Sequence, residues 1–185
     1  MNFLIKNLII SVFLFGGEMK SFNLTTDEQT FVDLEVDTIY FLEKKHKMKF
    51  AGARLACKDP KDFFCLNFKI MKKLSQAEIT EIILDSALYY RERINSNEKM
   101  QKQIAEHPFR LRNVEIDISM YAKNGNGIVH PDIGRGRWED GKLYYTTRSP
   151  ENFYKDQAEY IVSLEEVMPT LSEDLQKRLK EATIH

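Results

Sequence analysis

The sequence has only two cysteines, Cys57 and Cys65, among 185 residues. Their spacing makes a poor metal site, so we expect no bound metal. An excess of charge of one sign is also absent, because 27 basic residues stand against 28 acidic ones and the net charge is −1. Nucleic acids and anionic membranes attract proteins with a concentrated positive field. The charge balance therefore argues against both kinds of partner.

Long apolar runs are lacking after residue 21. Spanning a bilayer takes ~20 apolar residues, so we expect no stable membrane insertion of the mature chain. Hydrophobic residues make up 43% of the chain and charged residues 30%, a composition that allows a buried core and excludes a disordered chain. We divide the chain into a leader (residues 1–21), one α+β domain (residues 22–171) and a C-terminal helix (residues 172–185).

The leader allows two interpretations. Lys6 followed by the apolar residues 8–15 is typical of a secretory signal peptide. The candidate cleavage sites, after Gly17 and after Ser21, have a large residue at the −3 position, where a small residue is usual. Alternatively, residues 16–18 can be encoded by a bacterial ribosome-binding site, which would make Met19 the true start and the protein cytoplasmic. The unbroken apolar run after a positive charge favours export. We therefore expect a bacterial protein that is secreted or periplasmic, with a cytoplasmic protein as the alternative.

Hydrophobic periodicity predicts the elements of the domain. The clearest is a helix over residues 75–95, because Ser75 and Glu78 form a capping box and apolar residues recur behind them every three or four positions. The other predicted elements are a helix over residues 25–47, strands over residues 48–57, 63–71, 114–121, 133–138 and 142–148, a last strand or turn over residues 160–167, and a terminal helix from residue 172.

Consecutive strands that are joined by short turns pair antiparallel. The order helix, two strands, helix, three strands, helix therefore predicts a two-layer α+β fold, in which two long helices cover one face of an antiparallel sheet of four to five strands. In the first hairpin, pairing Leu55 with Leu66 keeps the apolar faces together. This register places Cys57 and Cys65 on different faces, so we expect two free thiols.

The densest polar stretch covers residues 125–141. His130 and Asp132 are candidates for a catalytic acid–base pair, and Arg135 and Arg137 could bind one anion because residues two apart on a strand point the same way. Turns rich in glycine, asparagine and proline also produce such stretches without any function, and we favour that interpretation for His130 and Asp132. We predict a binding role for Arg135, Arg137 and Trp138 in preference to catalysis.

Two further groups could take part in function. Glu115 and Asp117 share the polar side of a strand, where they would do acid–base chemistry if a cleft enclosed them and would merely aid solubility on an open face. The late tyrosines and phenylalanine would form an interaction surface if some of their rings were exposed beside Trp138. This aromatic group consists of Tyr144, Tyr145, Phe153, Tyr154 and Tyr160.

Residues 43–149 resemble a family of short exported proteins from chlamydia-like and other intracellular bacteria. The segments that carry the resemblance are EKKHKMKFAGARLA, LSQAEITEIILDSA, RINSNEKM, HPF, NVEIDIS, KNGN and DGKLYY. The resemblance implies an export signal, and it implies no activity and no binding residues. The segment of residues 134–138 departs from the family pattern, so we do not treat it as a shared site.

These observations favour an exported, non-enzymatic domain that binds another macromolecule, with a protein as the expected partner and no cofactor. The alternatives are a small hydrolase that uses His130 and Asp132, and a cytoplasmic structural partner if Met19 is the start. The sequence leaves the partner and the oligomeric state open.

Overall fold

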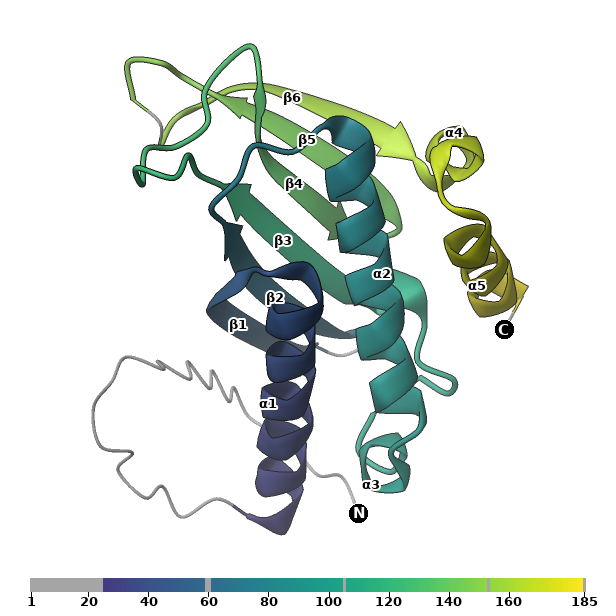
Figure 1. Ribbon diagram of the computed structural model, residues 1–185. Helices are drawn as coiled ribbons and strands as arrows, with labels where there is room; N and C mark the ends of the chain where they lie inside the picture. Colours follow the sequence, from purple (N-terminus) through teal and green to yellow (C-terminus); the bar gives the residue numbers. More distant parts are fainter. Residues whose placement is uncertain (1–24, 59–60, 105, 153, 185) are drawn as a thin grey trace.

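The computed structural model describes residues 25–58, 61–104, 106–152 and 154–184 (Figure 1). The leader of residues 1–21 lies outside the described residues, and so does the choice between a signal peptide and a start at Met19. Phe153, one of the late aromatic residues, is also outside them.

The domain is built on a six-stranded mixed sheet, whose strands lie in space in the same order as in the sequence. The strands are β1 (Lys49–Lys58), β2 (Lys61–Ile70), β3 (Val114–Met120), β4 (Ile133–Glu139), β5 (Lys142–Arg148) and β6 (Asp156–Ser163). The predicted α+β class is confirmed. The predicted antiparallel sheet of four to five strands is corrected in two respects, since there is a sixth strand and one pair is parallel.

The parallel pair is β2 and β3, whose register joins Phe64 to Val114 and Ile70 to Met120. The chain between them contains the helix α2 (Gln76–Asn95), which returns it to the end of the sheet where β2 began. A crossover that contains a helix produces a parallel pair, whereas a tight turn produces an antiparallel one. The prediction of an antiparallel sheet missed this effect of the connection.

The two long helices, α1 (Thr26–His46) and α2, lie on one face of the sheet, and α5 (Glu173–Ile184) packs beside α2 (Figure 1). The predicted capping box starts α2, because the Ser75 hydroxyl accepts a hydrogen bond from the Glu78 amide and the Glu78 carboxylate accepts one from the Ser75 amide. The shorter described helices are α3 (Glu98–Gln101), η1 (Leu111–Asn113), α4 (Leu164–Val167) and η2 (Met168–Thr170).

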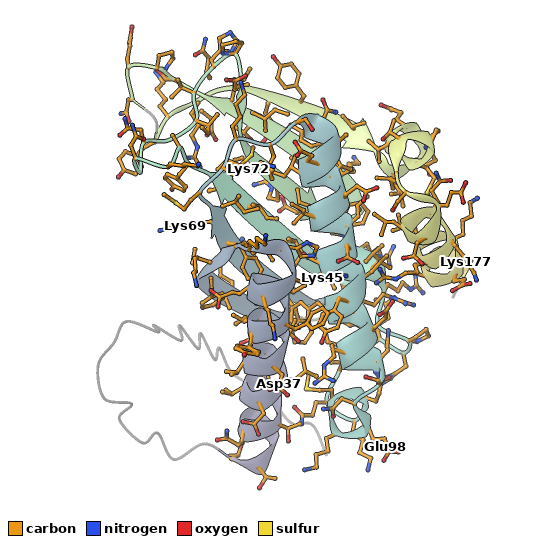
Figure 2. The ribbon with its side chains drawn as sticks, in the orientation of Figure 1. Asp37, Lys45, Lys69, Lys72, Glu98 and Lys177 are labelled. Atoms are coloured by element: carbon orange, nitrogen blue, oxygen red, sulfur yellow. The ribbon has the colours of Figure 1, made fainter. Side chains whose placement is uncertain are left out.

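Asp85 of α2 joins α2 to both α1 and α5. Its carboxylate lies 2.7 Å from the Lys45 Nζ atom, which points from the end of α1 toward α2 (Figure 2), and 2.8 Å from the His46 ring. Arg178 of α5 approaches the same carboxylate at 2.6 Å. Burial alone would raise the pKa of Asp85, but the hydrogen bonds from these three side chains lower that pKa well below its usual value. The C-terminal helix therefore packs on its own chain.

The first hairpin keeps the predicted faces but changes the predicted register. Leu55 pairs with Phe64 instead of Leu66, because β1 and β2 extend to Lys58 and Lys61 and leave a two-residue connection. A shift of two residues preserves the side-chain alternation. Cys65 therefore stays opposite to the apolar face, where it is a free and buried thiol paired in register with Arg54. The side chain of Cys57 lies outside the described ones.

Gly136 allows α2 to lie close to β4. A Cβ atom at this position would lie 2.8 Å from the Cδ1 atoms of both Ile79 and Ile83. We therefore expect Gly136→Ala to lower the free energy of unfolding by about 1 to 3 kcal/mol, measured by urea denaturation, because the helix must shift or its side chains must leave their rotamers. Adding Ile79→Val, which removes one of the clashing carbons, should recover part of the loss. Equal stability of Gly136→Ala and the wild type would contradict this close packing.

Candidate functional site

The polar side chains of the sheet gather on the face that α1 and α2 leave open, because successive residues of a strand point to opposite faces. No described helix covers this open face (Figure 1). One row across it, in register from β2 to β6, consists of Asn67, Asp117, Arg137, Tyr144 and Ile161. The neighbouring row consists of Lys69, Ser119, Arg135, Thr146 and Glu159.

Two carboxylates on the open face are buried beneath arginines. Glu115 and Asp117 are each only 5% exposed, although they lie on the polar side of β3. Arg54 of β1 reaches Glu115 at 2.9 Å. Arg135 of β4 holds both oxygens of Asp117, with its Nε atom 2.8 Å from Oδ1 and its Nη2 atom also bonded to Oδ2. The prediction that the two acids share a face is confirmed, and paired arginines enclose them.

Burial also changes the acidity of groups on this face. It raises the pKa of Glu115, although the charge of Arg54 acts in the opposite direction. Burial, followed by the negative charge of Glu115, raises the pKa of the neighbouring Cys65 thiol to about 12. A thiol with this pKa stays protonated at neutral pH and is a poor nucleophile. The open face therefore holds no activated cysteine at Cys65.

The predicted binding residues divide between the two faces of the sheet. Arg135 and Arg137 point the same way, as their spacing predicts. Trp138 is 2% exposed and packs in the core on the helix side, where its indole N–H donates to the Leu111 carbonyl at 3.0 Å. Adjacent residues of a strand must point to opposite faces, so Trp138 cannot share a surface with the two arginines.

The structure does not bring His130 and Asp132 together as a hydrogen-bonded pair among the described side chains. The carboxylate of Asp132 lies 2.7 Å from the Lys73 Nζ atom. His130 is exposed, and its backbone N–H donates to the carbonyl of Arg148. Asp132 therefore does not orient the His130 ring in this structure.

A hollow of about 240 Å³ opens on the polar face, and residues of all six strands contribute to its lining. Its lining includes Lys69, Ser119, Tyr121 and Arg148, of which sequence reasoning singled out none. The alternation of VEIDISM could have placed Ser119 on this face. Arg148 could have been placed there in the same way, because it lies two residues after Thr146 and four after Tyr144 in β5. Its burial and its neighbours depend on the tertiary structure.

A larger hollow of about 690 Å³ lies on the helix side, between the end of α1 and the start of α2. Ile70, Met71, Leu74, Ala77 and Ile82 give it a mainly apolar wall. Within the described ranges, no group of three or more histidine, cysteine, aspartate or glutamate side chains could hold a metal ion. No helix in the described part of the chain has the length and apolar character needed to cross a membrane.

Comparison of the chain with protein-family models found no match, and neither did comparison with curated proteins or with solved structures. The resemblance to exported proteins of intracellular bacteria therefore stays a prediction.

Proposed function

We propose that this protein is an exported, non-enzymatic binding protein whose protein partner docks on the open face of the sheet. The observation that carries the proposal is the row of Arg137, Tyr144 and Ile161 on three adjacent strands. This row replaces the predicted set of Arg135, Arg137 and Trp138. It keeps Arg137 and exchanges Arg135, which Asp117 holds, and the buried Trp138 for Tyr144 and Ile161.

The row combines side chains that protein interfaces favour. Ile161 of the edge strand β6 is 57% exposed, and Tyr144 lies beside it in register. The Arg137 guanidinium stacks over the Tyr144 ring at 4.7 Å and is held from the sides by Glu139 at 3.0 Å and Glu159 at 3.5 Å. Arginine and tyrosine are common hot-spot residues, and side chains that are already held in place lose less entropy on binding.

The charges of the open face favour a protein over a nucleic acid. Arg54, Arg135 and Arg137 each have a carboxylate partner on the same face. Binding to a phosphate backbone depends on cations that are free to neutralise phosphates. Most of the positive charge on this face is already neutralised by the protein's own acids, which supports the expectation of no nucleic-acid partner.

The proposal of a non-enzymatic role rests on the same pairing. The two buried acids of β3 are held by arginines, and the thiol of Cys65 stays protonated. His130 and Asp132 are not hydrogen-bonded to each other among the described side chains, so the hydrolase alternative receives no support from their geometry.

Site-specific photocrosslinking tests the docking surface. A photoreactive phenylalanine analogue replaces Ile161 in one variant and Tyr160 in a matched control, since Tyr160 is 52% exposed on the same strand but points to the helix side. We expect position 161 to give a discrete crosslinked protein in the cells that naturally produce the chain, and position 160 to give little of it. No crosslinked protein at position 161, or equal yields at both positions, would contradict docking on the open face.

The same cells, separated into fractions, test export. The mass of the N-terminal peptide should place the mature start near Ser21 or Phe22 in an exported fraction. A start at Met19 in the cytosol would contradict export, and it would leave the docking surface to be judged by the crosslinking alone.

A further inference from the structure

Arg148 is a buried cation without a carboxylate partner among the described residues. Arg148 is 8% exposed. Its Nη2 atom donates a hydrogen bond to the Ser119 hydroxyl at 2.8 Å. The guanidinium also lies over the Tyr121 ring at 5.6 Å. A hydroxyl and a ring face compensate a buried positive charge much less than a carboxylate does. Within the described ranges, Arg148 therefore has no negative partner of the kind that buried arginines usually have.

The acids near Arg148 do not supply this partner. Asp117 is held at both oxygens by Arg135. Asp156 lies opposite Arg148 in the β5–β6 register, and both residues line the hollow of about 240 Å³ on the open face. No ion pair joins the two in the described part of the chain. By contrast, Arg54, Arg135 and Arg137 on the same face each contact a carboxylate.

A second cation faces the same hollow. Lys69 of β2 lies with its Nζ atom 6.0 Å from the centre of the Tyr121 ring, so Tyr121 contacts both Lys69 and Arg148. Figure 2 shows the Lys69 side chain projecting outward from the sheet, away from α2. Because Asp117 is paired with Arg135, the two remaining cations of the hollow face the single carboxylate of Asp156. The hollow has an unbalanced positive charge.

The geometry points to a binding site for a small oxyanion, a carboxylate or a phosphate group, in the hollow between Arg148 and Lys69. A guanidinium has five N–H donors in a planar fork that matches the oxygens of either group. One donor group of Arg148 binds Ser119, and no other hydrogen bond joins the guanidinium to a described residue. The volume of about 240 Å³ is below the range of drug-sized pockets and suits a ligand of a few heavy atoms.

This oxyanion site is independent of the proposed protein interface. The interface row consists of Arg137, Tyr144 and Ile161, and none of these three residues lines the hollow. Loss of one site leaves the other in place, so the two proposals can fail separately.

Calorimetric titration of the full chain at low ionic strength tests the oxyanion site. The probes are sodium succinate and inorganic phosphate, with succinamide as the uncharged control. We expect saturable binding of succinate, of phosphate or of both, and no binding of succinamide. The anion that binds with the higher affinity identifies the class of oxyanion that the site prefers. Amide chemical shifts of the wild type should move at Ser119, Tyr121 and Arg148. Saturable binding of neither anion would overturn the proposal, and so would shifts confined to other parts of the chain.

Three variants assign the binding to named side chains. Arg148→Gln should weaken the affinity about tenfold or more, since it removes charge-assisted hydrogen bonds. Lys69→Gln, at an exposed position, should weaken the affinity several-fold and serves if Arg148→Gln does not fold. Arg112→Gln removes an arginine at a distant, exposed ion pair and should leave the affinity unchanged. Equal affinity of the wild type and Lys69→Gln would overturn the site as described, as would equal weakening by Arg112→Gln.

Discussion

Replacing Arg135 with glutamine should lower the free energy of unfolding by about 3 kcal/mol at neutral pH. The Asp117 side chain is 7% exposed, and Arg135 holds both of its oxygens. The substitution leaves a buried carboxylate without its cation, which costs more than the net contribution of the intact pair. Urea denaturation of the wild type and the variant measures the difference.

Two further variants separate this pair from a general effect of charge. Arg112→Gln breaks only an exposed contact with Glu106 at 3.7 Å and should cost less than about 0.5 kcal/mol. Adding Asp117→Asn to Arg135→Gln removes the unpaired charge and should recover much of the loss. If Arg135→Gln costs no more than Arg112→Gln, the pair with Asp117 is not structural. Arg135 would then be as available to a ligand as the sequence alone predicts.

Replacing Glu35 with glutamine should make the protein more stable by about 3 kcal/mol above pH 7. Glu35 is 3% exposed between α1 and α2, where it accepts a hydrogen bond from the Tyr90 hydroxyl at 3.2 Å. Burial raises the pKa of Glu35 to about 7, and the hydrogen bond from Tyr90 opposes this effect only in part. A glutamine can keep the hydrogen bond without carrying the charge.

The pH dependence of the effect follows from the raised pKa. Between pH 4.5 and about 7, the folded state holds the Glu35 proton while the unfolded state has released it. The wild type should therefore lose stability relative to Glu35→Gln as the pH rises through this window, and the difference should be constant above it. Asp85 acts at lower pH and with the opposite sign, because its lowered pKa makes stability fall as the pH falls.

Urea denaturation at several values between pH 5 and pH 8 measures the Glu35 effect. Asp33→Asn, at an exposed position of the same helix, is the matched control and should follow the wild-type profile. A difference between the wild type and Glu35→Gln that does not change between pH 5 and pH 7 would show that Glu35 titrates normally. It would therefore contradict the burial of this carboxyl group.

The sequence predicted most of the individual elements of this protein. The capping box at Ser75 and Glu78, and the apolar repeat behind it, are local signals that involve residues three or four apart. The alternation of VEIDISM likewise determines which side chains of β3 share a face. Local periodicity was sufficient for these predictions, because each depends only on near neighbours in the chain.

The arrangement of the strands was harder to predict from the sequence. The parallel pairing of β2 and β3 depends on the path of α2 across the sheet, and the register of the first hairpin depends on the length of its connection. Placing Trp138 with Arg137 was an error that strand alternation alone could have prevented, since adjacent strand residues face opposite ways.

The chain by itself determined the residue types of the open face and the side of each strand on which they lie. Only the tertiary structure decided which charges meet there. Asp117 pairs with Arg135, 18 residues away in the sequence, and Glu115 pairs with Arg54, 61 residues away. The order and register of four strands bring these partners together. The same long-range packing buries Arg148 without a described carboxylate. Partners that far apart in sequence depend on the whole sheet, so no local pattern encodes them.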